Sequence, residues 1–204
     1  MERRAARTRA CRRLALIVTT DEELWAVTIG EPRVHDGPIG LADSDPAWPA
    51  MFEREVARIS AALGERALLI EHVGSTSVPG LAAKPIIDMV MVVRDSSDEA
   101  SYVPALERGG YTLRIREPDW FEHRLLKGPD TDVNLHVFSE GCPEVGRMLR
   151  FRDHLRTDPA DRKRYEEAKR ELAARNWKYV QNYADAKTEV IEEILTRAYG
   201  ATRA

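Results

Sequence analysis

Apolar side chains recur at helical spacing in the stretch that follows Asp45 and Pro46. They stand three or four residues apart, which places them on one face of an α-helix, at Trp48, Phe52, Val56, Ile59 and Leu63. Asp45 can cap the free amides of a helix start, and Pro46 suits the first helical position. Gly64 is a usual helix end. The pattern predicts an amphipathic helix from Asp45 to Leu63.

The run 86–93 is apolar at every position except Asp88. Such a run is typical of a β-strand that is buried on both faces. Shorter β-type patterns predict further strands over 67–73, 111–116, 120–127 and 133–138. The short connections between the last three strands favour antiparallel neighbours. A helix is expected over 97–108, closed by two glycines.

The chain beyond residue 141 is helical in pattern. Pro143 and Pro159 each follow a plausible cap and open a helix, and Asn176 caps a third helix that reaches Tyr199. We therefore expect an α/β (α+β-like) fold with a C-terminal helical extension. The expected division is an N-terminal extension at 1–38, a core at 39–140 and helices packed on it at 141–204.

Charge is distributed unevenly along the sequence. The whole chain of 204 residues carries a net charge of −3, but residues 1–13 contain six arginines and one glutamate, which leaves the remainder at −8. A body of that sign is a poor general nucleic-acid binder. The basic start is most simply a partly disordered extension, with a transit-type presequence or a nucleic-acid-binding arm as the alternatives.

Several classes of protein are disfavoured by what the sequence lacks. The apolar run 14–18 is shorter than a secretory signal core, and no later stretch approaches membrane-spanning length. Cys11 and Cys142 are far apart and have no partners at metal-ligand spacing, so we expect free thiols. The sequence predicts a cytoplasmic protein without a membrane partner.

Candidate chemistry is concentrated between residues 71 and 88. A strand runs into Gly74, Ser75, Thr76 and Ser77, where a glycine lets backbone approach a ligand and the hydroxyls supply compact donors. This turn suits phosphate oxygens, and Lys84 adds a cation. Asp88 lies within the apolar strand, where an ionised carboxylate needs a metal or donors to compensate it. An ordinary surface loop that satisfies a structural aspartate is an equally open interpretation.

The chain resembles the GrpB family, also labelled UPF0157. The resemblance runs from about residue 41 to residue 198 and is carried by segments 45–49, 71–88, 134–138, 151–156, 165–169 and 183–187. The family is assigned to the nucleotidyltransferase superfamily and occurs alone or fused behind dephospho-coenzyme A kinase. The resemblance implies a nucleotidyltransferase-like mixed β-sheet flanked by helices, a Gly-Ser motif that holds triphosphate, and acidic residues on adjoining strands that hold magnesium.

One departure from the superfamily pattern weakens this implication. Asp88 matches the first carboxylate, but the position of the second, two residues later on the same face, is Val90. Two-ion catalysis is therefore in doubt. His136 is the preferred helper for a single divalent ion (Mg²⁺ or Mn²⁺) and for catalysis, and His123 is a further candidate ligand.

Other residues have both a functional and a structural interpretation. His72 either contacts the ligand and orients the turn or makes a structural hydrogen bond. Lys169 and Lys187 each follow a tyrosine by four residues, and either reach phosphate or lie on solvated helix faces, which is the commoner case. Tyr183 either stacks on a base or packs in the core.

Two functional hypotheses follow. The first is metal-assisted transfer of a nucleoside monophosphate from a triphosphate to a small acceptor. The alternative is a non-catalytic protein that binds a nucleotide or coenzyme-A-related ligand and has a degenerate metal site, which Val90 favours. Under both, the partner is a nucleotide or phosphorylated small molecule, and a homodimer is conceivable. The acceptor and the base are not specified by the sequence.

Overall fold

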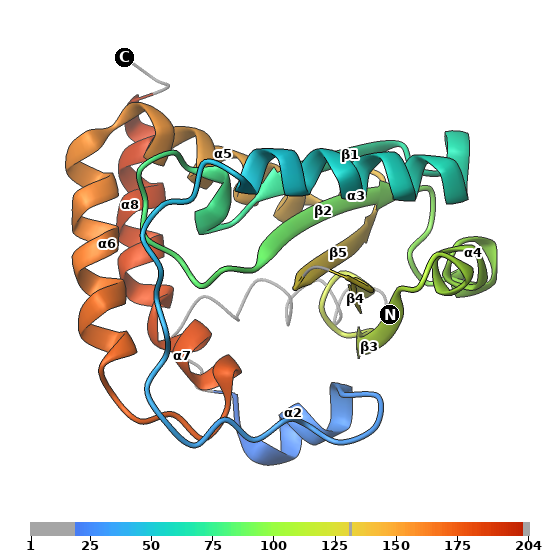
Figure 1. Cartoon of the computed structure of the whole chain (residues 1–204), viewed down its shortest axis with the longest axis horizontal. Helices are drawn as coiled ribbons and strands as arrows, with labels where there is room; N and C mark the ends of the chain where they lie inside the picture. The colour runs from blue at the N-terminus through green and yellow to red at the C-terminus, as the bar shows by residue number, and fades with distance from the viewer. Residues whose placement is uncertain (1–18, 131, 202–204) are drawn as a thin grey trace, which may run out of the picture.

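The computed structural model describes residues 19–130 and 132–201. The predicted basic extension therefore has its arginine-rich part, residues 1–13, outside the described residues. Figure 1 shows a central sheet with helices on both sides. The helices are α2 (Asp21–Val27), α3 (Trp48–Leu63), α4 (Val103–Arg108), α5 (Pro143–Thr157), α6 (Pro159–Ala173), α7 (Val180–Ala186) and α8 (Thr188–Ala201).

The sheet is mixed, as predicted. Its strands are β1 (Leu69–Val73), β2 (Ile87–Val93), β3 (Thr112–Glu117), β4 (His123–Lys127) and β5 (Val133–Ser139), in the spatial order β1-β2-β5-β4-β3. β2 and β5 are parallel, and every other neighbouring pair is antiparallel. The central pair β2 and β5 sets Asp88 beside Asn134 and Val90 beside His136.

β2 is buried on both faces, which confirms the interpretation of its apolar run. Met89, Met91 and Val93 pack into the larger core with α3 and α4. Val90 and Val92 point to the opposite face, where they pack with Phe138 and with Val145 of α5. Because side chains alternate along a strand, Asp88 shares this second face with Val90.

The second face carries the C-terminal helices. α5, α6 and α8 pack against one another, and α7 joins α6 and α8. In Figure 1, α6 and α8 stand side by side at one end of the sheet, and α7 lies below them near α2. None of the described helices combines the length and the apolar character needed to cross a lipid bilayer.

Element boundaries differ from the predictions at several points. The first long helix begins at Trp48 rather than Asp45, whose carboxylate accepts a hydrogen bond from the amide of Ala47 at 2.8 Å. The helix predicted over 97–108 is a 3₁₀ turn followed by the short α4. The single last helix is divided into α7 and α8 at Lys187. β4 begins only at His123, because the two preceding residues have positive φ.

Candidate functional site

The Gly74 turn lies directly against the carboxylate of Asp88. β1 ends at Val73, which pairs with Asp88, and the turn Ser75–Ser77 follows Gly74. Gly74 has φ 67° and ψ −173°, a conformation that residues with a side chain rarely adopt. A Cβ atom built on Gly74 would lie 2.4 Å from Oδ2 of Asp88. Glycine is therefore required here both by its backbone conformation and by the approach of the carboxylate.

Asp88 is half-buried and has one side-chain hydrogen-bond donor. Nδ2 of Asn134 donates to its Oδ1 at 2.7 Å. Burial raises the pKa of Asp88, and the bond from Asn134 and the charges of nearby lysines oppose that rise. The three lysines are Lys187, Lys127 and Lys84. The carboxylate is thus compensated by cationic side chains of the chain itself.

Four lysines surround this carboxylate and the adjacent turn, and we call them, with Asp88 and Ser75, the lysine site. Lys84 comes from the loop before β2, Lys127 from the end of β4, Lys169 from α6 and Lys187 from the break between α7 and α8. Burial lowers the pKa of Lys84 and of Lys187. Asp88 raises the pKa of both, whereas Lys187 and Lys127 lower that of Lys84. The lysines lie close enough to repel one another, and a bound anion would reduce this repulsion.

Lys169 is only 2% exposed, so the interpretation of this residue as part of a solvated helix face is wrong. Its Nζ donates to Oγ of Ser75 at 3.0 Å and to the carbonyl of Ala82. Burial, and then the charge of Lys187, lower the pKa of Lys169 to about 7. The phenol of Tyr165 is hydrogen-bonded to Ser75, and burial raises its pKa to about 12.

Tyr183 places an unsatisfied hydroxyl beside these residues. The side chain is 2% exposed, and its OH is the one buried side-chain polar atom without a hydrogen-bond partner among the described residues. Nζ of Lys187 lies over the Tyr183 ring at 4.5 Å from its centroid. A buried hydroxyl without a partner is unfavourable, so it marks a position where a bound group would supply the missing hydrogen bond.

The other hydroxyls of the turn hold its conformation. Oγ of Ser77 donates to the carbonyl of Gly74 at 2.6 Å, and Oγ1 of Thr76 donates to the carbonyl of Ile86 at 3.0 Å. Nε2 of His72 lies 3.0 Å from Oγ1 of Thr76. Of the residues proposed to bind phosphate, Ser75, Lys84 and Lys187 lie in the lysine site, and Gly74 borders it. His72, Thr76 and Ser77 make hydrogen bonds that support the turn.

His136 and His123 form a hydrogen-bonded chain that ends at Glu117. Nδ1 of His123 lies 2.8 Å from a carboxylate oxygen of Glu117, and Nε2 of His123 lies 3.0 Å from Nδ1 of His136. An ionised carboxylate accepts hydrogen bonds, so Nδ1 of a neutral His123 donates to Glu117. Nε2 of His123 then accepts a hydrogen bond from Nδ1 of His136. Nε2 of His136 is then an acceptor. Burial first, and then His123 and Lys127, lower the pKa of His136 to about 3, which keeps it neutral.

A cavity of about 740 Å³ lies between this histidine chain and helices α2, α5, α7 and α8. His136, His123 and Glu117 line it, together with Trp120, Asp185 and Arg147. Its size is within the range of pockets for small ligands. No residue of the lysine site lines this cavity, but the charge of Lys127 lowers the pKa of His136, which places the cavity near that site.

The residues around Asp88 do not fit a two-ion metal site. Val90 offers no ligand, Oδ1 of Asn134 accepts from Nζ of Lys127 at 2.8 Å, and Nδ1 of His136 is engaged with His123. In the described ranges, the three-residue group with metal-ligand atoms within 4.8 Å is His154, Asp158 and Asp161, which lies elsewhere. A single ion on Asp88 with His136 and His123 remains a prediction.

The sequence reasoning did not identify several residues of the site. Lys127 could have been found from strand alternation, which places it on the face of His123. Asn134 and Asp132 both accept a hydrogen bond from Lys127. No local sequence pattern identifies Tyr165 or Glu117 as site residues, because their roles depend on which helix or strand packs opposite them.

Comparison with known proteins agrees with the resemblance seen in the sequence. The family model described as GrpB protein matches residues 38–197. A UPF0157 protein of Halalkalibacterium halodurans is 62% identical over 179 residues, covering 88% of this chain and 92% of that protein. The crystal structure of the conserved protein GrpB from Enterococcus faecalis superimposes with a TM-score of 0.68 at 30% identity, covering 78% of this chain and 99% of that one.

A more distant relative carries the name of an enzyme. A dephospho-CoA kinase of Mycolicibacterium paratuberculosis is 28% identical over 218 residues, which covers 91% of this chain but 54% of that protein. The similarity therefore concerns about half of the kinase chain. Together, the family match and the identity to the Halalkalibacterium protein show that this chain belongs to the GrpB (UPF0157) family.

Proposed function

We propose that the protein binds a nucleotide or a related phosphorylated small molecule, with the phosphates in the lysine site. The observation that carries this proposal is that Lys84, Lys127 and Lys187 act on the Asp88 carboxylate, while Lys169 binds Ser75 of the adjacent turn. The four lysines come from separate parts of the fold. The unsatisfied hydroxyl of Tyr183 supplies a further donor. The neighbouring cavity of about 740 Å³ would hold the rest of the ligand.

The charges favour a phosphate ligand over a bare metal ion. Asp88 and Asp132 are two carboxylates among four lysines, which leaves an excess of positive charge that repels a divalent cation and attracts a polyphosphate. Each charge-assisted hydrogen bond to phosphate contributes about 1.5–3 kcal/mol. Loss of one lysine is therefore expected to weaken binding by roughly ten- to a hundredfold.

Nucleotidyl transfer is the second candidate, and the acceptor nitrogen of His136 favours it. In that reaction an acceptor hydroxyl would form a bond to the α-phosphorus of a nucleoside triphosphate. Its proton would pass to Nε2 of His136, and pyrophosphate would leave. The low pKa of His136 keeps that nitrogen unprotonated, although it also makes the imidazole a weak base.

Calorimetric titration with ATP separates these proposals. We expect binding in EDTA that Lys187→Gln weakens at least tenfold, whereas Lys163→Gln, which removes an exposed lysine paired with Glu167, leaves it unchanged. Equal affinities for the two variants would refute the lysine site. Release of pyrophosphate that requires Mg²⁺ or Mn²⁺ and disappears in Asp88→Asn would support transfer. Binding that persists without release would support the binding function alone.

A further inference from the structure

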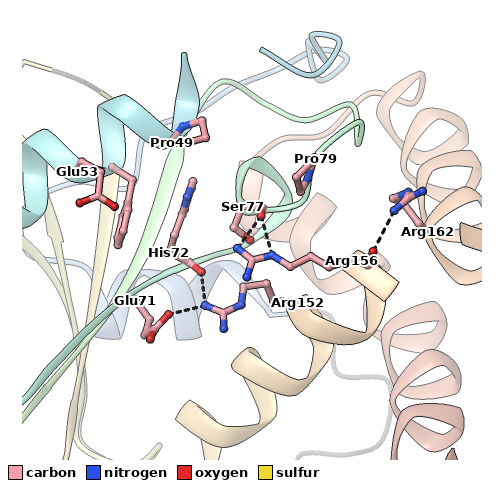
Figure 2. A pocket seen from close by; sticks show the side chains of 10 residues that line it. Pro49, Glu53, Glu71, His72, Ser77, Pro79, Arg152, Arg156 and Arg162 are labelled. Carbon is pink, nitrogen blue, oxygen red and sulfur yellow. Dashed lines mark hydrogen bonds and ion pairs between the residues drawn. The ribbon is translucent and has the colours of Figure 1, made fainter. Parts of the chain in front are cut away.

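A second cavity lies at the edge of the sheet, on the other side of the Gly74 turn. It has a volume of about 420 Å³ and shares no lining residue with the larger cavity. His72 projects to the face of the sheet opposite Asp88, because it pairs with Met89 in the antiparallel ladder. Figure 2 shows Arg152 and Arg156 reaching from α5 toward β1 and the turn, with Arg162 on the neighbouring helix. We call this cavity the arginine pocket.

Only one of its three arginines is closely paired with carboxylates. Arg152 is buried, and it donates to Glu71 at 2.6 Å and to Asp153 at 2.7 Å. Arg156 donates through Nε and Nη2 to the carbonyl of Ser77 at 3.0 and 2.9 Å, and its contact with Asp153 is 3.5 Å long.

Arg162 contacts only backbone carbonyls in the described part of the chain. These are the carbonyls of Leu155 at 3.3 Å and Arg156 at 3.4 Å, both long for a hydrogen bond. Arg156 and Arg162 therefore bring positive charge that the surrounding carboxylates leave largely uncompensated.

Two neighbouring groups respond to this charge. The pKa of His72 is lowered to about 4, first by burial and then by Arg156 and Arg152. The pKa of Arg156 is itself lowered, by burial and by the charge of Arg152. Both shifts have the sign expected of a pocket with positive potential.

The remaining lining gives the pocket two different ends. Glu53 and Glu71 lie on the side of α3 and β1, whereas Arg156 and Arg162 lie on the side of α5 and α6. Between them, the rings of Phe52 and His72 stack at 4.8 Å with an interplanar angle of 8°. A ligand with an anionic group at one end and hydroxyl or amine donors at the other matches this lining.

We propose that the arginine pocket is a second binding site, for a small molecule that carries a phosphate group. Arg156 and Arg162 both line the pocket, and guanidinium donors suit the oxygens of the phosphate. Arg156 also holds the carbonyl of Ser77, and His72 contacts Thr76, so a ligand here touches both supports of the Gly74 turn.

The experiment uses inorganic phosphate and the full chain, followed by NMR of the His72 imidazole. Phosphate near Arg156 should partly cancel the arginine charges, so the pKa of His72 should rise on saturation. Arg162→Gln should weaken the phosphate affinity reported by His72 at least tenfold. Arg175→Gln, which removes an exposed arginine paired with Glu171, should leave it unchanged. Arg162 makes only long hydrogen bonds to backbone, so its replacement should leave the fold intact.

Lys187→Gln separates this proposal from the lysine site. We expect the His72 response to survive in that variant, because Lys187 does not line the arginine pocket. A response abolished by Lys187→Gln, a response equal in Arg162→Gln and wild type, or no response to phosphate would each overturn the proposal. Failure of ATP to bind the lysine site would not, since the readout at His72 is independent of it.

Discussion

The contact between Gly74 and Asp88 allows a sharp test of the site geometry. In Gly74→Ala the new methyl would lie 2.4 Å from Oδ2, 2.8 Å from Cβ and 3.0 Å from Cγ of Asp88. The positive φ adds backbone strain of about 1–3 kcal/mol. Relief of the overlap requires displacement of the turn or of β2, which adds about 1–3 kcal/mol. The expected loss of unfolding free energy is about 2–6 kcal/mol.

Gly80→Ala is the matched control for this substitution. Gly80 has φ 77° and is also exposed, but a Cβ atom there would meet no atom within 4 Å. Gly80→Ala therefore introduces the backbone strain without the steric overlap, and we expect a loss of about 1–3 kcal/mol. The difference between the two variants isolates the contact with Asp88.

Urea denaturation followed by circular dichroism measures both variants. We expect the midpoint of Gly74→Ala to lie well below that of Gly80→Ala, with equal m-values, because the change acts on the folded state. Equal midpoints would show that the turn does not press on Asp88. The geometry of the lysine site would then be incorrect.

Three further predictions concern single side chains. Tyr183→Phe removes an unsatisfied hydroxyl, so the stability of the free protein should be unchanged or raised by up to about 1 kcal/mol, while ATP affinity falls; a clear loss of stability by thermal denaturation would contradict the assignment. Tyr111→Phe removes the hydrogen bond to the buried carboxylate of Glu55 and should destabilise the fold by about 1–3 kcal/mol in urea, against no change if water replaces the hydroxyl. In the wild type, ¹⁵N NMR should show His136 protonated on Nδ1, and protonation on Nε2 would refute the proposed direction of the hydrogen bonds from His136 to Glu117. Glu117→Gln should give a mixture of the two His136 tautomers.

The sequence was most informative where local pattern and burial agree. The apolar run of β2 predicted a strand buried on both faces, and the cores on its two sides confirm this. The Gly74 turn and Asp88 were recognisable together, because an aspartate in an apolar strand beside a glycine turn is unusual. The helical C-terminal part also followed from periodicity, whereas the mixed sheet was implied by the resemblance to the GrpB family.

The lysine site was only partly predictable, because tertiary packing assembles it. Lys169 has the sequence context of an exposed helix position, yet α6 turns it inward to Ser75. Lys127 contributes only through its register opposite Asn134. Neither helical nor strand periodicity predicts which long side chains will point into a site. Side chains such as these can be placed only from the three-dimensional structure.

The depressed pKa of Lys169 leads to a prediction about pH. At pKa about 7 in the fold against 10.5 for an unperturbed lysine, the unfolded chain holds the proton between these values and the folded chain does not. Stability is therefore expected to rise with pH above about 7, and Lys169→Met should abolish this part of the pH dependence. Over two pH units the effect approaches about 2–3 kcal/mol.

Ligand binding should show the opposite trend. A bound phosphate stabilises the charged form of Lys169, so ATP affinity should fall as the pH rises from 7 to 9, where the free protein has lost this charge. Titrations at pH 6, 7, 8 and 9 should give a decline in wild type that is absent in Lys169→Met. An affinity independent of pH in both proteins would place the phosphates away from Lys169. The same decline in both would assign it to another group.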